Sequence, residues 1–333
     1  MMPGDRRLLL GVLIFGVLLL PAACSDKEEQ RSEISAPSPE NATVATTLTR
    51  ARQGDAGAQN TVGKAYTTGT GLPRDDTQAY RWFKRAAHQG QRQAQYNLAL
   101  LLQQGRGVSR DPALAARWLR RSAKQGLAPA RFQLGNLYRK GLGVSADMRR
   151  AANLYRSAAK QGYVPAQYNL GLLYDKGQGV PAESKIAAHW YRRAARQGLA
   201  VAQVKLGNKY MQGDGVDPDA QQGFVWFKRA ARQGNAMAQY NLGVMYMRGK
   251  GVEQDLVEAY VWSSLAAERG IQRAIGNRSA LQDLLDIDQH ERADKRLRRL
   301  RRNYGGSRRQ QDFASSIGAS KRSRQVIPGE TVR

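Results

Sequence analysis

Arginine and lysine side chains recur at spacings of three and four residues, which place side chains on one face of a helix. The chemistry that they could supply is the binding of anions. The chain carries 53 Lys+Arg against 27 Asp+Glu, a formal net charge of +26, which favours an acidic or polyanionic partner. The alternative is a solvated ridge without a ligand, because cations near helix C-termini also stabilise the helix dipole. The candidate residues are Arg81, Arg85, Arg117, Arg121, Lys124, Arg193, Arg196, Arg229 and Arg232.

The sequence contains no arrangement of residues that favours catalysis. His88, His189 and His290 have no common spacing that would bring them together. A single cysteine excludes an intramolecular disulfide and a cysteine-rich zinc site. Gly-x-Gly motifs recur, but each follows an expected helix rather than a strand, which is typical of a turn and not of a phosphate-binding loop. We therefore predict a protein that is not an enzyme and has no cofactor or metal site.

The N-terminal residues resemble an export signal with a lipid attachment site. Two arginines precede an apolar run over 8–20, which has the length of a signal-peptide core and is short for a membrane span. The sequence Pro-Ala-Ala-Cys ends at Cys24 and resembles the lipobox of bacterial lipoproteins, although Pro21 stands where that pattern usually has leucine. We predict a signal peptide over 1–23 and lipidation at Cys24. The alternatives are an ordinary cleaved signal and an uncleaved anchor.

The segment that follows the cysteine predicts a tether. Residues 24–47 are polar, contain two prolines and lack aromatic side chains, so we expect a flexible linker between the lipid and a folded domain. This organisation predicts a protein on the periplasmic face of a bacterial envelope. Ser25, rather than aspartate, follows the cysteine and favours the outer membrane.

A repeat of 36 residues organises the rest of the chain. Glycine recurs at this interval, and an alanine follows each of these glycines by four residues. All five tryptophans share one position of the repeat, and Leu154 takes that position in the remaining unit. Such recurrence predicts a solenoid rather than two compact domains. The glycines are Gly54, Gly90, Gly126, Gly162, Gly198, Gly234 and Gly270, and the tryptophans are Trp82, Trp118, Trp190, Trp226 and Trp262.

Each unit divides into two helices. In the first helix, Leu170, Leu173 and Tyr174 follow the spacing of one apolar helix face. Glycine recurs at the position of Gly171, in the middle of this helix, although it costs about 1 kcal/mol of helix stability relative to alanine. This recurrence indicates close approach of a neighbouring helix. The second helix buries the tryptophan with alanines and opens after an acid; an aspartate at that position can accept hydrogen bonds from helix-start amides. These acids are Asp75, Asp111, Asp147, Glu183, Asp219 and Asp255.

The combined pattern, AxxxLGxxYxxGxGVxxDxxxAxxWYxxAAxQG, resembles the Sel1-like repeat family, relatives of the tetratricopeptide repeat. The resemblance covers 54–269 and implies an all-α fold, a right-handed α/α superhelical solenoid of stacked helix pairs with a concave face that binds partners. Residues 285–297 also resemble the closing helix of bacterial members. We expect an N-terminal helix and six repeats over 48–269, a partial repeat and capping helix over 270–302, and a basic, disordered tail over 303–333.

Three functions remain open from the sequence. The leading hypothesis is an exported, membrane-anchored scaffold that binds a protein partner through the concave face in an envelope or secretion assembly. The second is binding of a polyanion, such as envelope polysaccharide, lipopolysaccharide or anionic lipid, through the basic ridge and tail; nucleic acid is not expected for an exported protein. The third is a penicillin-binding or peptidoglycan-active enzyme, although relatives associated with penicillin binding carry a cysteine pair in each repeat, which this chain lacks.

Overall fold

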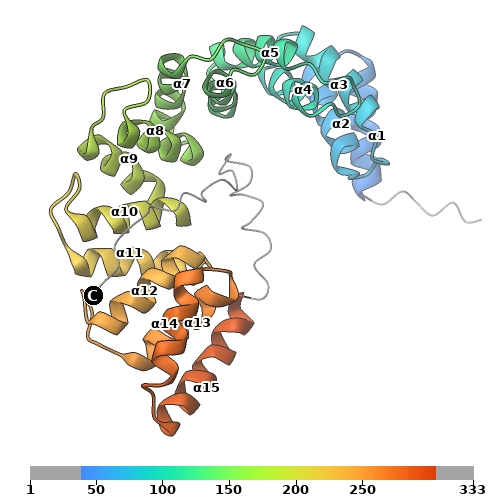
Figure 1. Cartoon of the computed structure of the whole chain (residues 1–333). Helices are drawn as coiled ribbons and strands as arrows, with labels where there is room; N and C mark the ends of the chain where they lie inside the picture. The colour runs from blue at the N-terminus through green and yellow to red at the C-terminus, as the bar shows by residue number, and fades with distance from the viewer. Residues whose placement is uncertain (1–38, 305–333) are drawn as a thin grey trace, which may run out of the picture.

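The computed structural model describes residues 39–304, and this part of the chain contains fifteen helices and no strand. Consecutive helices from α1 to α14 pack against each other, and the resulting pairs follow one another along an open arc (Figure 1). The predicted all-α solenoid is thereby confirmed. The helices are α1 (Pro39–Arg52), α2 (Ala56–Thr68), α3 (Asp76–His88), α4 (Arg92–Gln104), α5 (Pro112–Lys124), α6 (Ala128–Lys140), α7 (Met148–Lys160), α8 (Val164–Lys176), α9 (Ser184–Arg196), α10 (Ala200–Gln212), α11 (Ala220–Arg232), α12 (Ala236–Arg248), α13 (Leu256–Glu268), α14 (Gln272–Gln282) and α15 (Ile287–Tyr304).

Two kinds of glycine set the spacing between helices. A Cβ at Gly171, in the middle of α8, would lie 2.7 Å from the ring of Tyr191 on α9, so the predicted close approach is confirmed. Gly143, in the turn after α6, has φ +70°, and a Cβ there would lie 2.3 Å from the carbonyl of Pro112 at the start of α5. Glycine has no Cβ to collide with this carbonyl, and it adopts a positive φ without strain. The turn of one repeat can therefore contact the preceding repeat directly.

Aspartates begin the second helices as predicted, with one exception. The side chain of Asp111 accepts a hydrogen bond from the backbone N–H of Leu114 at 2.8 Å, and the other four aspartates make the equivalent bond. Glu183 stands at the N-cap of α9, as predicted for the acid before each second helix, but its side chain makes no such bond. The glutamate side chain has one more methylene group than aspartate, and short side chains are the ones that reach helix-start amides.

The predicted tether extends too far toward the C-terminus. Helix α1 begins at Pro39, inside the segment 24–47 that the sequence predicts to be flexible. Val44 packs against the glycine turn after α2, and Gln59 Nε2 donates to the carbonyl of Ala51 at 3.1 Å. The same glutamine-to-carbonyl bond recurs one repeat later. Helix α1 is therefore the second helix of an incomplete leading repeat, and its Ala51 packs in one apolar cluster with Val62 of α2 and Trp82 of α3.

Helix α15 closes the C-terminal end without continuing the repeat. It lies against α13, rather than pairing with α14 as a second helix would (Figure 1). A stripe of small and branched apolar side chains on α15 joins the apolar core of α13, so the last repeat is covered. The joint cluster includes Val261, Trp262, Leu265, Ala293, Leu297 and Leu300.

Some predictions concern other segments. The predicted signal peptide over 1–23, the lipidation site Cys24 and the tail beyond residue 304 lie outside the described residues. No helix in the described range 39–304 is long and apolar enough to cross a membrane.

Candidate binding surfaces

All nine predicted cationic residues are exposed on second helices, and we refer to them as the basic ridge. They lie on α3, α5, α9 and α11, several of them in the last helical turn, where a cation also opposes the helix dipole. At α7 the ridge is thin, because Asn153 and Ser157 take the positions of Arg117 and Arg121. The basic ridge is therefore divided into an N-terminal block on α3 and α5 and a C-terminal block on α9 and α11.

Four arginines of the ridge stack on the tryptophan three residues earlier. The guanidinium carbon of Arg121 lies 4.6 Å from the centroid of the Trp118 ring. At exposed sites such contacts contribute about 0.5–1 kcal/mol. The stacking covers the outer face of a nearly buried tryptophan and fixes the direction of the arginine, so these arginines serve the repeat itself as well as any ligand. The equivalent pairs are Arg85–Trp82 at 4.9 Å, Arg193–Trp190 at 5.4 Å and Arg229–Trp226 at 4.6 Å.

A second cationic row, absent from the sequence-based prediction, runs beside the ridge. Arg156 Nη2 donates to the hydroxyl of Tyr174 on the next first helix at 3.0 Å. The same bond joins Arg120 to Tyr138, where it lowers the pKa of the tyrosine hydroxyl. The periodic signal was present, because a basic residue occupies this position in five consecutive units. The row consists of Lys84, Arg120, Arg156, Arg192 and Lys228.

The two rows together surround a shallow depression on α5. Its volume is about 370 Å³, and Arg117, Arg120, Arg121 and Lys124 line it. These four side chains are all cationic, so the depression presents hydrogen-bond donors and positive charge to any ligand.

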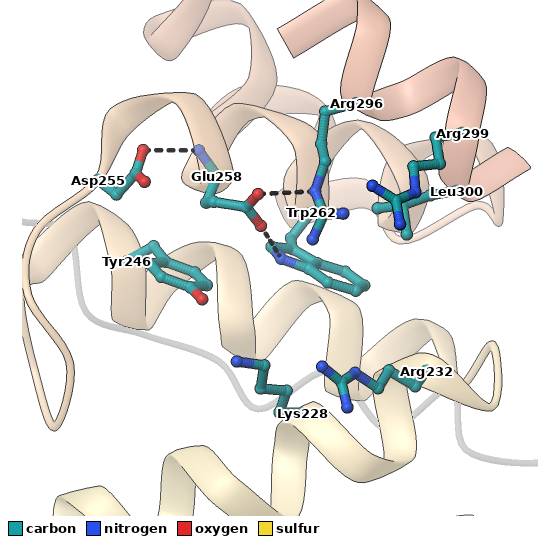
Figure 2. Close-up of a pocket in the computed structure, with 9 residues that line it drawn as sticks. All are labelled: Lys228, Arg232, Tyr246, Asp255, Glu258, Trp262, Arg296, Arg299 and Leu300. Carbon is teal, nitrogen blue, oxygen red and sulfur yellow. Dashed lines mark hydrogen bonds and ion pairs between the residues drawn. The ribbon is translucent and has the colours of Figure 1, made fainter. Parts of the chain in front are cut away.

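A larger pocket of about 510 Å³ lies where α11, α12, α13 and α15 meet (Figure 2). Glu258 in its wall is already occupied, because it accepts hydrogen bonds from Trp262 Nε1 and Arg296 Nε, each at 2.8 Å. Lys228, Arg232 and Arg299 also line the pocket and form no ion pair within residues 39–304. Arg232 belongs to the predicted ridge. The pocket residues on α15 were not predicted, because the sequence does not specify that α15 packs against α13.

The first helices present a face of different chemistry. Helices α6 and α8 lie toward the inside of the arc in Figure 1, with α5 and α7 farther out. Half-exposed amide, aromatic and aliphatic side chains follow the first helices from α4 to α12, with Lys205 as a charged member. Some amides bond between repeats, as in Asn97 Nδ2 to Asn60 Oδ1 at 2.9 Å. We refer to this set as the inner face: Tyr96, Asn97, Leu100, Gln133, Asn136, Tyr168, Leu172, Lys205, Asn208, Tyr240, Asn241 and Val244.

The three histidines lie in separate aromatic contacts. His88 packs edge-on against Trp118 with ring centroids 5.1 Å apart, and His189 packs in the same way against Trp190 at 5.2 Å. His290 contacts Tyr260 at 5.8 Å. Across residues 39–304, no three or more side chains of the His, Cys, Asp and Glu types are grouped so that they could hold a metal ion.

The geometry of the repeats agrees with a comparison against protein families. The Sel1 repeat model matches six consecutive segments, 56–91, 92–127, 128–163, 164–199, 200–235 and 236–271. The chain belongs to the Sel1 repeat family. Sel1 repeat proteins are generally non-enzymatic scaffolds, and their repeats are typical of protein–protein interaction.

Solved structures include several relatives. A Sel1 repeat protein from Oxalobacter formigenes is 30% identical, with 68% of this chain and 96% of that chain covered and a TM-score of 0.58. The protein c5321 from uropathogenic Escherichia coli, a protective antigen with an SLR fold, is 28% identical over 88% of this chain and 77% of its own, with a TM-score of 0.37. A search of curated proteins finds no match.

Proposed function

We propose that this Sel1 repeat protein is a scaffold that binds a protein partner through the inner, concave face of the solenoid. The observation that carries the proposal is the chemistry of the inner face, which is rich in amides and aromatic rings and poor in charge. Amide side chains donate and accept hydrogen bonds, as a polypeptide backbone requires, and tyrosines supply large contact areas at low entropic cost. Within this set a polyanion would find only the cation of Lys205.

A glutamine ladder supports the proposal because it holds the repeats at fixed spacing. Gln197 Nε2 donates to Gln167 Oε1 at 2.8 Å, and Gln167 Nε2 donates to the carbonyl of Ala159 at 3.2 Å. Corresponding bonds join Gln233 to Gln203 and Gln125 to Gln95. A surface that is ordered before binding loses less entropy when the partner docks.

We further propose that the scaffold is exported and held by a lipid at Cys24, on the periplasmic face of the outer membrane. The support is in the sequence: an apolar run over 8–20 behind two arginines, and a lone cysteine after small residues. Mass spectrometry of the mature N-terminus tests this part. A diacylated or triacylated Cys24 is the expected result, and a free thiol at Cys24 or an intact residue 1 would refute it.

Site-specific crosslinking in native envelopes tests the inner face. A photoreactive amino acid replaces Tyr168 in one variant and Tyr240 in another, and Arg149, exposed at the start of α7, in the control. Both inner-face variants should crosslink the same protein, and the control should not. Leu172→Glu, which places a charge one turn after Tyr168 on α8, should then prevent the crosslink at Tyr168. Equal crosslinking from the control, or a crosslink that Leu172→Glu leaves intact, would contradict the proposal.

A further inference from the structure

Helix α15 shows how a helix can cover the ridge side of a second helix. Ala293, Leu297 and Leu300 lie at the spacing of one helix face and pack in one cluster with Val261, Trp262 and Leu265 of α13. In the repeat, Val261 and Leu265 take the positions that Arg117 and Arg121 have in α5. Two ridge positions of the last repeat are therefore apolar, and a helix covers them; Glu268 takes the ridge position of Arg232.

Ion pairs fix the edges of this intramolecular contact. Arg296 Nε lies 2.8 Å from Glu258 Oε1, and Arg301 Nη2 lies 2.5 Å from Glu268 Oε1. The covered helix thus presents an apolar centre with acidic edges, and the covering helix presents an apolar stripe with basic edges. Complementary charge at the edges sets the register and the choice of partner more than it adds affinity.

Helix α11 presents part of the same centre, with edges of the opposite charge, because Arg229 takes the position of Leu265 and stacks on Trp226 at 4.6 Å. Val225 stands at the position of Val261 and is 37% exposed, and Trp226 stands at the position of Trp262. Lys228 and Arg232 flank this centre, and neither of them forms an ion pair within the described residues. Nothing in the described chain covers α11 in the way that α15 covers α13.

The pocket of Figure 2 joins this uncovered face to α15. Lys228 and Arg232 of α11 line it from one side, and Arg299 of α15 lines it from the other. Three cations that form no ion pair within residues 39–304 thus line one pocket, at the edge where a second helix would lie beside α15. Carboxylates entering the pocket would satisfy these guanidinium and ammonium groups.

We propose that an acidic amphipathic helix of a protein partner docks on α11 beside α15. Its apolar stripe covers Val225 and the Arg229 side chain that lies on Trp226, and its carboxylates bind Lys228, Arg232 and Arg299. The apolar centre favours a protein helix over a polysaccharide, because a sulfated or carboxylated sugar chain would leave Val225 uncovered. The site is distinct from the inner face and stands or falls independently of the proposed function.

The test uses the full chain and a synthetic peptide as the probe. The peptide has the sequence of residues 287–304 with every arginine and lysine replaced by glutamate, so that it keeps the apolar stripe of α15 and has acidic edges. Fluorescence anisotropy of the labelled peptide should show saturable binding. The double variant Lys228→Glu/Arg232→Glu should weaken it about tenfold or more. The control Arg248→Glu/Lys250→Glu, two exposed cations elsewhere, should change it by less than about twofold.

Three further measurements separate the proposal from its alternatives. A peptide of equal charge, with serine at the positions of Leu297 and Leu300, should bind about tenfold more weakly. Equal binding of both peptides would show a surface for polyanions in general and overturn the proposal. Val225→Glu on α11 should abolish binding, whereas a peptide that displaces α15 from α13 would be unaffected. Circular dichroism should show that all variants remain folded, which their exposed positions favour.

Discussion

Lys209 Nζ lies 2.6 Å from Asp175 Oδ1, and this ion pair joins α10 to α8 in the interior of the solenoid. The lysine side chain is only 4% exposed and also lies 2.8 Å from Asp214 Oδ2. Tyr191 donates its hydroxyl to the other oxygen of Asp175 at 2.9 Å. The positions equivalent to Lys209 in four other repeats are apolar, so the lysine introduces a charge where those repeats have apolar packing. The residues equivalent to Lys209 are Leu101, Leu137, Leu173 and Met245.

Removing Asp175 alone should destabilise the protein more than removing the whole pair. Asp175→Met leaves the buried ammonium of Lys209 with one carboxylate, and breaking such a pair should cost about 3 kcal/mol. The double variant Lys209→Leu/Asp175→Met should recover most of this loss, because leucine and methionine occupy these positions in other repeats. Urea unfolding measures both. A double variant no more stable than Asp175→Met would show that the two residues do not stabilise each other.

The contribution of Asp214 should depend on pH. Hydrogen bonds from Lys209 and then Ser184 hold the pKa of Asp214 below its usual value. A carboxylate with a lowered folded-state pKa stabilises the fold above its unfolded pKa of about 3.9, and this stabilisation is lost as the pH falls through the folded pKa. Asp214→Asn should therefore cost roughly 1 kcal/mol or less at pH 7, since the side chain is half exposed, and nothing once Asp214 is protonated. A cost that persists at the lowest pH would exclude the ionic contribution.

The pKa of Lys209 is shifted in the opposite direction. Burial lowers it, but hydrogen bonds to Asp175 and Asp214 more than offset the burial and leave it above its usual value. The stabilisation from the ammonium group is therefore complete below the unfolded pKa of about 10.4 and is lost as the pH rises through the folded value. Lys209 and Asp214 together should thus stabilise the wild type most between these two limits.

The sequence determines the repeated part of the fold better than its ends. Tryptophan, glycine and alanine at a period of 36 residues predict the helix pairs, because each pair buries its apolar face against identical neighbours. The apolar stripe through Leu297 identifies α15 as a packed helix, but nothing in that stripe specifies α13 as its partner. The buried ion pair of Lys209 could not be predicted from the sequence for another reason. A lysine at a position that is apolar in other repeats does not show which carboxylate will lie beside it, and only the structure places Asp175 there. The second cationic row, which includes Arg156, recurs at the repeat period and was predictable from the sequence.

Two glycines with similar backbone angles should respond differently to alanine. Gly143 has φ +70° and Gly162 has φ +88°, so alanine at either site carries the left-handed strain of about 1–2 kcal/mol. Around Gly162 no atom lies within 4 Å of the added Cβ, whereas at Gly143 the Cβ would lie 2.3 Å from the Pro112 carbonyl. Gly143→Ala should therefore cost about 2 kcal/mol more, by thermal or urea unfolding. Equal costs would mean that the turn does not contact the preceding repeat in solution.

The stacked arginines should contribute to stability, and their unstacked neighbours should not. Arg121→Gln removes the contact 4.6 Å above Trp118 and should lower the free energy of unfolding by about 0.5–1 kcal/mol. Arg117→Gln, one turn earlier and exposed without such a stack, is the matched control and should change stability by less than about 0.5 kcal/mol. Equal effects would mean that the loss comes from net charge rather than from stacking.

Disrupting the contact between α15 and α13 should destabilise the last repeat. Leu297 is 3% exposed and packs in the cluster that contains Trp262, which is 2% exposed. Leu297→Asp places a carboxylate in that cluster without a cationic partner, which should cost about 3 kcal/mol or more and make Trp262 accessible to iodide quenching. Arg298→Asp, on the exposed side of α15, is the control and should leave quenching unchanged.

Truncation after Leu281 should cause aggregation, because a terminal repeat without its capping helix exposes Val261 and Leu265. A truncated chain that stays monomeric and unfolds cooperatively would show that α13 does not require α15 as a cap.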